Sequence, residues 1–311
     1  MDSVEPIPVE EIIAHLLNAA EPVLSTELGE LSNLVPPELK LLQSTWTQIP
    51  PERRRLIVTR LVELLEDDVV FNFDAVFKFS LNDPDEEVRA AAIEGLWENE
   101  DTLLIDLLIS RMERDDSERV QAAAALGLGK FVILVEHGKL RQAYLVRLSQ
   151  SLLRAANDQN RPVEVRRRAL EAVAPFSIPE VKQAIHQAYN STDPRLRVSA
   201  VYAMGKNLDP TWLLTLLDEM NSPDPEMRYE AAGACGELED ENSVDGLIEL
   251  VEDMDSDVRS AAIQALAKIG NREAMDCLDE CLKSEDEAIR ELAGQVLKEL
   301  DTGDDPFAFK L

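Results

Sequence analysis

The residues that could do chemistry are few in this chain of 311 residues. Its histidines are His15, His137 and His186, and none is followed by Glu, so the sequence contains no His-Glu metal motif. Three scattered histidines also give no Ser-His-Asp arrangement. His186 lies between Ile185 and Tyr189 on an expected helix, where we expect a structural role.

The three cysteines and one glycine-containing string give no better candidates. Cys277 and Cys281 lie four residues apart, on one face of an expected helix, but two thiols hold a metal only with two further ligands. Cys235 belongs to an apolar column described below. The string GLGK at Gly127 lacks the first glycine and the Ser/Thr of a phosphate-binding loop. We therefore expect no catalytic residue, no metal site and no cofactor.

Charge is distributed unevenly along the chain. Residues 1–136 hold 11 Lys+Arg and 28 Asp+Glu, residues 137–208 hold 12 and 5, and residues 209–311 hold 8 and 28. The three segments therefore carry net charges of −17, +7 and −20. Acidic segments repel phosphates, so we expect no nucleic-acid binding. They also favour solubility.

The N-terminus and the apolar runs predict a soluble chain. The sequence begins MDSVEPIPVEEII, without a basic segment before an apolar one, so no export signal is expected. The apolar run Phe131–Val135 is far short of the ~20 residues that a membrane span needs. The odd number of cysteines argues against a disulfide framework. We expect a cytoplasmic protein.

The elements that position every side chain come from a repeat. One block reads DPDEEVRAAAIEGL from Asp83, DPRLRVSAVYAMG from Asp193 and DSDVRSAAIQALAKIG from Asp255. Spacings between successive anchors are 32, 45, 31, 31, 31 and 31 residues, the length of two short helices with two turns. The anchors are Arg89, Gln121, Arg166, Arg197, Arg228, Arg259 and Arg290.

Columns at fixed offsets from the anchor predict how the second helix packs. Three residues after each anchor stands an alanine, which indicates a helix packed too closely for a larger side chain. Apolar residues stand just before the anchor and seven residues after it, on the same face. The alanines are Ala92, Ala124, Ala169, Ala200, Ala231, Ala262 and Ala293. The aspartates four residues before most anchors predict N-caps: Asp85, Asp193, Asp224, Asp255 and Asp286.

The pattern of an apolar helix, an Asp-Pro turn and Val-Arg-x-x-Ala-x-x-Ala-Leu-Gly resembles HEAT repeats. It is most similar to the short kind grouped with phycobilin-lyase-like repeats, in seven copies over about residues 70–300. The resemblance implies an all-α fold, a right-handed α-solenoid (α-α superhelix) of about seven hairpins. It also implies an Asp–Arg ladder along the stack, with a structural role for the arginines, and second helices that line a concave wall.

Three segments depart from the repeat. The 45-residue interval predicts a helical insertion near residues 137–155. Residues 1–70 lack the signature but predict helices at Val9–Ala20, Pro37–Thr47 and Pro51–Leu65, which we interpret as an N-terminal cap before an array at 71–300. Residues 301–311 form an acidic C-terminal tail, mobile or docked through Phe307 and Phe309.

Surface positions are the remaining candidates for function. On each second helix, offsets of two, five and nine residues from the anchor point away from the core. In most copies these positions carry alanine or common polar residues. In the middle copies they carry residue types that are frequent in binding hot spots. The candidate partner-binding residues are Arg168, Glu171, Tyr202, Lys206 and, at the edge, Tyr229.

Three functional hypotheses remain open. The first is a non-enzymatic scaffold or adaptor that binds a protein partner on its concave surface, with an acidic or mixed segment engaging copies three to five. The second, implied by the resemblance, is a lyase-like accessory protein that handles a tetrapyrrole. The third is a regulatory subunit of an enzyme complex. Self-association through the basic middle segment is an alternative use of the same charges.

Overall fold

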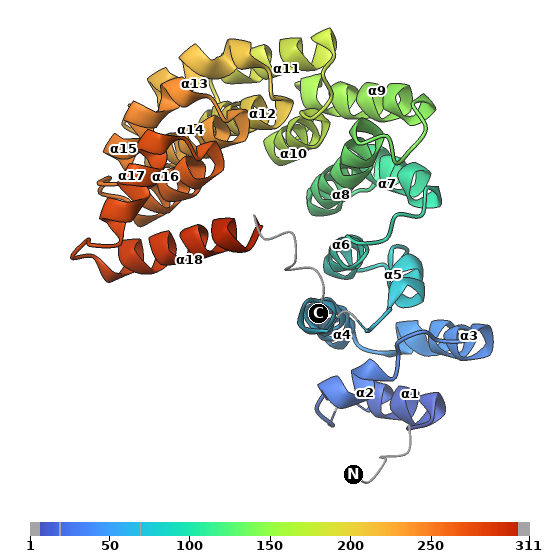
Figure 1. The fold of residues 1–311 in the computed structure, drawn as a ribbon. Helices are drawn as coiled ribbons and strands as arrows, with labels where there is room; N and C mark the ends of the chain where they lie inside the picture. Colours follow the sequence, from blue (N-terminus) through green and yellow to red (C-terminus); the bar gives the residue numbers. More distant parts are fainter. Residues whose placement is uncertain (1–6, 19, 69, 304–311) are drawn as a thin grey trace. The chain divides into compact units, whose positions relative to one another are not determined.

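The computed structural model describes residues 7–18, 20–68 and 70–303, which contain helices and turns and no strand (Figure 1). The predicted all-α class is therefore confirmed. The chain forms two compact units. Unit 1 takes residues 1–151 and 158–172, and unit 2 takes residues 152–157 and 173–311. Helices α9 and α10 contribute residues to both units.

Unit 1 is built from helical hairpins whose second helices contact one another. Helix α5 pairs with α6 and α7 pairs with α8, while α4, α6 and α8 contact in succession. Its helices are α1 (Val9–Leu17), α2 (Ser25–Gly29), α3 (Pro36–Thr45), α4 (Pro51–Asp67), α5 (Asp74–Ser80), α6 (Glu86–Gly95), α7 (Leu103–Arg114) and α8 (Glu118–Glu136), followed by α9 (Ala143–Asn157) and α10 (Val163–Val173).

Unit 2 repeats the same arrangement more regularly. The first helices α11, α13, α15 and α17 each contact the helix that follows, and the second helices α12, α14, α16 and α18 contact in succession. The helices are α11 (Pro179–Tyr189), α12 (Pro194–Asn207), α13 (Leu213–Glu219), α14 (Pro225–Leu238), α15 (Val244–Leu250), α16 (Ser256–Ile269), α17 (Arg272–Cys281) and α18 (Glu287–Gly303).

The extra residues of the long interval lie in two long helices. Helix α8 has 19 residues where α12, α14 and α16 have 14, and α9 has 15 residues where α13 and α15 have 7. A turn with Gly138 at φ 69° separates α8 from α9. The helical insertion that the sequence predicts near residues 137–155 corresponds to α9, which begins at Ala143 after the turn that follows Glu136.

The predicted caps are present at the start of the second helices. The Asp85 carboxylate accepts from the backbone N–H groups of Glu87 and Val88, and Asp255 does the same for Asp257 and Val258. These carboxylates satisfy donors that have no partner within the helix and oppose the positive end of its dipole. Asp193, Asp224 and Asp286 accept from backbone N–H groups in the same way.

Close approach of neighbouring second helices explains the small residues in the repeat. All seven alanines of the predicted column are fully buried. A methyl group added to Gly205 on α12 would lie 2.7 Å from Cα of Ala234 on α14. One added to Gly236 on α14 would lie 2.8 Å from Cα of Ala265 on α16. Only residues without a bulky side chain allow these helices to lie so close.

Ion pairs link several neighbouring hairpins within each unit. The Arg89 guanidinium donates to both carboxylate oxygens of Asp115, at 3.0 and 2.7 Å, and to the backbone oxygen of Asp83 at 2.9 Å. Arg228 holds Asp253 in the same bidentate way, at 2.7 and 2.8 Å. The Arg228 hydrogen bond lowers the pKa of Asp253 against the opposing effect of burial. The expected Asp–Arg ladder is therefore present in both units.

The ladder extends into the N-terminal segment. Arg54 on α4 donates to both oxygens of Asp83, at 2.9 and 3.0 Å, and both side chains are buried. The indole N–H of Trp46 also donates to Asp83, at 2.6 Å. The helices predicted for residues 1–70 correspond to α1, α3 and α4, but Arg54 acts there as a further anchor, 35 residues before Arg89.

Two further predictions concern the N-terminal and C-terminal segments that flank the repeats. The role of residues 1–70 as a cap stays a prediction. Helix α18 runs to Gly303, so its backbone covers the first three residues of the predicted tail. Phe307 and Phe309 lie outside the described residues.

The alanine column generates a prediction about stability. We expect Ala231→Leu to lower the free energy of unfolding by about 1–3 kcal/mol, because the larger side chain has no space between the helices. Gly233→Ala on the same helix should raise it by about 0.5–1 kcal/mol, because a Cβ there meets nothing within 4 Å. Urea unfolding measures both. Equal midpoints for the two variants would contradict a close helix contact.

The buried rung generates a second prediction. Arg54→Ala leaves the buried Asp83 carboxylate without its counter-charge, so it should cost about 3–5 kcal/mol of unfolding free energy. Arg259→Ala is the control, because the Arg259–Asp286 pair at 3.4 Å is partly exposed and should cost at most about 1 kcal/mol. Urea titration of both variants makes the comparison. A loss for Arg54→Ala no larger than that of its control would show that the buried rung is not needed.

Candidate partner-binding face

The structure brings Tyr202, Lys206 and Tyr229 together on the second helices of unit 2. Tyr202 and Lys206 lie on α12 and Tyr229 on α14, and all three line one hollow of about 160 Å³ that reaches α16. We call this surface the tyrosine face and define it by Tyr202, Lys206, Tyr229, Glu237, Gln264 and Lys268.

A row of charged side chains crosses the tyrosine face near the C-terminal ends of α12, α14 and α16. The Lys206 ammonium donates to Oε1 of Glu237 at 3.0 Å, and the Lys268 ammonium donates to the same oxygen at 2.7 Å. Partial burial of Glu237 favours its neutral form, but these two hydrogen bonds hold its pKa below the usual value. Lys206 also lies 5.6 Å from the centroid of the Tyr202 ring, within cation–π range.

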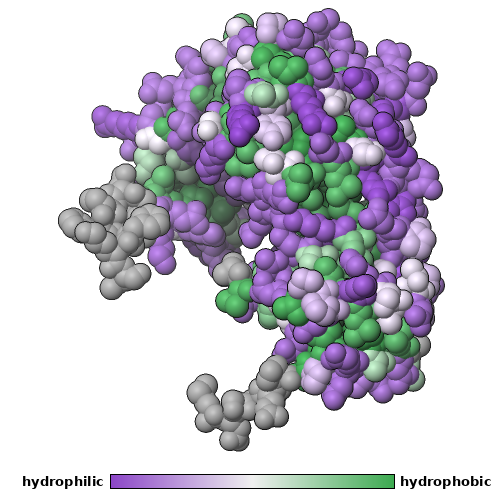
Figure 2. Space-filling view, turned by 90° about the vertical axis from the view of Figure 1, so that its right-hand side faces the viewer, coloured by the Kyte–Doolittle hydropathy of each residue, from purple (hydrophilic) through white to green (hydrophobic). Residues whose placement is uncertain are grey.

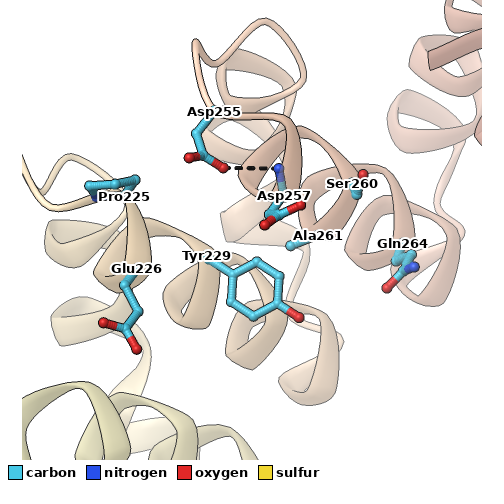
Figure 3. Close-up of a pocket in the computed structure, with 8 residues that line it drawn as sticks. All are labelled: Pro225, Glu226, Tyr229, Asp255, Asp257, Ser260, Ala261 and Gln264. Carbon is cyan, nitrogen blue, oxygen red and sulfur yellow. Dashed lines mark hydrogen bonds between the residues drawn. The ribbon is translucent and has the colours of Figure 1, made fainter. Parts of the chain in front are cut away.

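A groove of about 560 Å³ lies between α14 and α16 at the other end (Figure 3). Tyr229 stands in it with 43% of its surface exposed, and Figure 3 shows its ring between Glu226 at the start of α14 and Asp257 on α16. The lining contains carboxylates and no Lys or Arg. The Asp255 carboxylate accepts from the Asp257 N–H at 2.9 Å and so caps α16. This end of the tyrosine face is negative.

The other two predicted residues lie on unit 1. Arg168 on α10 donates to Glu164 and to Glu171, at 2.9 Å in each case. Both carboxylates belong to its own helix, so the guanidinium is held along α10 and its charge is locally neutralised. The role of Arg168 and Glu171 in partner binding stays a prediction.

Other basic groups of the middle segment are also paired. Lys182 pairs with Asp209 in unit 2, and this contact is the largest cause that lowers the pKa of Asp209 to about 2. Arg147 pairs with Asp106 in unit 1. The net positive charge that the sequence shows at 137–208 is therefore partly neutralised by carboxylates of the fold. The surface that Figure 2 shows is mostly hydrophilic, with separate hydrophobic patches.

The tyrosine face contains residues that the sequence analysis did not single out. Glu237 follows the anchor Arg228 by nine residues, and Gln264 and Lys268 follow Arg259 by five and nine. These are the same offsets that selected Tyr202 and Lys206. The sequence therefore indicated that these residues point outward. The ion pairs that join Glu237 to two other copies could be recognised only from the spatial arrangement.

The cysteines and His186, the residue types most often used in catalysis or metal binding, lie in packed environments. Burial raises the pKa of the Cys235 thiol to about 12, and burial is also the largest cause that raises the pKa of Cys281 to about 12. The His186 ring packs on Trp212 with centroids 4.5 Å apart. Among the described residues, no three His, Cys, Asp or Glu side chains are arranged to hold a metal ion. No described helix combines the length and apolar character needed to cross a membrane.

Comparisons with known proteins identify the same repeat. The sequence profile of a family described as HEAT repeats matches residues 73–159 and 211–298. A comparison with curated proteins gives no match. The phycobilin-lyase-like kind of repeat stays a prediction.

Solved structures show the same fold. Yeast importin-β (Kap95p) aligns with 97% of this chain at 13% identity and a TM-score of 0.53. Importin-β crystallised with ammonium sulfate aligns with 94% of this chain at 16% identity and a TM-score of 0.50. The chain spans about half the length of these proteins, 47% and 46% respectively. At this identity, the similarity establishes the fold, an α-solenoid, and nothing further.

The shared carboxylate generates a prediction about the tyrosine face. Glu237→Gln should lower the free energy of unfolding by about 0.5–1 kcal/mol at low salt, because it leaves Lys206 and Lys268 without their common partner. The difference should shrink in about 0.5 M salt, where exposed charges are screened. Glu249→Gln, at an exposed residue without an ion pair in the described part of the chain, is the control. Urea unfolding at both salt concentrations tests this, and a salt-independent loss would contradict it.

Proposed function

This chain belongs to the HEAT-repeat family, and we propose that it acts as a protein-interaction scaffold that binds a partner on the tyrosine face rather than as an enzyme. The observation that carries this proposal is the pair of tyrosines on a surface made only from packed helices. Tyr229 is 43% exposed, and Tyr202 lines the same hollow. Tyrosine is enriched where few residues contribute most of the binding energy.

Rigidity of the surface supports the proposal. The helices of the tyrosine face are fixed by the Gly205–Ala234 and Gly236–Ala265 contacts and by the Arg228–Asp253 pair. A surface that is already ordered before binding loses little conformational entropy when a partner docks. The backbone positions that carry the two tyrosines are therefore held at fixed spacing.

Charge on the tyrosine face favours a partner of mixed charge. Carboxylates surround Tyr229, whereas two lysines share one carboxylate at the other end. This arrangement differs from the net positive middle segment that the sequence indicated, because part of that charge is paired. Complementary charges on a partner would orient it along the helices and reject wrong partners.

Relatives of the same fold are found in protein complexes. Structures exist of Kap95p with RanGDP and with Nup1, and this chain aligns with both at 14% identity, with TM-scores of 0.53 and 0.50. They support protein binding as a use of this fold. A regulatory subunit of an enzyme complex would be one form of such a scaffold. No feature of the tyrosine face favours the binding of a tetrapyrrole.

The test is capture of a partner with matched variants. The full chain is used as bait in lysate of its native host, and retained proteins are quantified by mass spectrometry. Tyr202→Ala with Tyr229→Ala should reduce retention of the specific partner by about tenfold or more, the effect expected of hot-spot residues. Leu214→Ala, 75% exposed on α13 of the same unit, should retain it fully.

Photo-crosslinking locates the contact independently. A photoreactive phenylalanine analogue replaces Gln264 in one variant and Leu214 in the other. The partner should crosslink from position 264 on the tyrosine face and not from position 214. Melting temperatures of all variants should match that of the parent chain. Full capture by the double tyrosine variant, or crosslinking only from position 214, would refute the proposed face.

A further inference from the structure

A second surface, on unit 1, carries exposed apolar side chains, one of them where α6 and α16 carry polar ones. At the position five residues after the anchor, α8 has Leu126, whereas α6 has Glu94 and α16 has Gln264. Leu126 is 42% exposed. Ile133, seven residues further along α8, is 43% exposed and points to the same side of the helix. These two side chains form an apolar stripe roughly 10 Å long.

The start of this stripe forms the floor of a groove. A hollow of about 550 Å³ lies over α6, α8 and α10, and Ala122, Ala123 and Leu126 of α8 are its apolar lining residues. Small residues keep the floor low, since a bulky side chain at Ala122 or Ala123 would fill it. The remaining lining residues are Glu86, Glu87, Glu94, Ser117, Glu118, Arg119, Glu164 and Arg168.

The rim of this groove has uncompensated negative charge. Both arginines are already paired, Arg119 with Glu87 and Arg168 with Glu164. Glu86, Glu94 and Glu118 form no ion pair with any described residue. Burial raises the pKa of Glu94, and the nearby Glu87 charge raises it further, whereas Arg119 lowers it. A cation brought to the rim would stabilise all three carboxylates.

From this combination we propose that the α6–α8–α10 groove binds a basic amphipathic helix of a partner protein. Apolar side chains of that helix would lie on Ala122, Ala123 and Leu126, and flanking lysines or arginines would reach the glutamates. An amphipathic helix buries its apolar face in such a groove through residues three, four and seven positions apart. An anionic membrane or a nucleic acid is disfavoured by the same acidic rim. This inference rests on the proposed scaffold function.

The experiment uses the full chain and three labelled peptides of about 14 residues, roughly four helical turns. The first has leucines on one helical face and Lys/Arg elsewhere. The second has the same composition with its leucines spread around the helix. The third has the first pattern with Glu in place of Lys/Arg. Fluorescence anisotropy should show that the first binds about tenfold or more tightly than the other two.

Variants separate the groove from general attraction to a chain of charge −30. Leu126→Asp adds a negative charge, so simple attraction would strengthen binding of the basic peptide, whereas loss of the apolar floor should weaken it by about tenfold. Leu214→Asp is the control, since it adds the same charge at an exposed leucine of unit 2. Glu94→Gln with Glu118→Gln should also weaken binding, and the weakening should diminish at high salt.

Several outcomes would overturn the inference. They are equal binding of the two basic peptides, stronger binding to Leu126→Asp, or an equal effect of Leu126→Asp and Leu214→Asp. Concentration-dependent sedimentation of the parent chain that Leu126→Asp abolishes would show that a second copy occupies the groove instead. The assay is independent of the tyrosine face. Failure of the peptides leaves the crosslinking result from position 264 intact, and the reverse also holds.

Discussion

In both units of this protein, neighbouring hairpins are joined by a guanidinium that bonds a carboxylate of the following copy and a carbonyl of its own turn, as Arg54, Arg89, Arg228 and Arg259 do. Arg89 does this with Asp115 and with the Asp83 oxygen, and Arg54 does it one copy earlier, with Asp83 and with the Ile49 oxygen. A bidentate contact sets the direction as well as the distance between partners. Because the two buried charges are expensive unless paired in this geometry, the rung permits only a narrow range of positions for neighbouring hairpins.

Dense helix packing depends on that register. The alanines in the core column and the glycines that face Ala234 and Ala265 remove the side chains that would hold second helices apart. The ladder aligns the helices, and the small residues allow them to meet. Equivalent positions of successive copies therefore lie side by side, so residues 31 positions apart in the sequence become direct neighbours, as Lys206, Glu237 and Lys268 do.

Both candidate surfaces follow from this alignment and differ only in what stands at equivalent positions. On α12, α14 and α16 those positions carry Tyr202, two lysines and a shared carboxylate, and Tyr229 lies beside them. On α8 they carry Leu126 within an acidic rim. One repeat thus provides a rigid frame, and a few outward residues in each copy decide the chemistry. A fold of this kind does not by itself imply a function, which depends on the outward residues placed on it.

The sequence by itself determined the helical class, the period, the cap aspartates, the buried alanines and the outward offsets, because each is set by local periodicity and recurs in most or all copies. It did not reveal Arg54 as an anchor, since Pro50 and Pro51 replace the Asp-Pro turn there and the partner Asp83 lies 29 residues away. It also overstated the basic centre. Net charge is additive along a chain, but the field at a surface depends on which carboxylates lie near each cation. Arg168 is neutralised by its own helix and Lys182 by Asp209, which follows it by 27 residues. The pairing of Arg168 with residues three and four positions away on one helix was readable from the sequence. The pairing of Lys182 with Asp209 is decided by tertiary structure, because no linear pattern brings those two residues together.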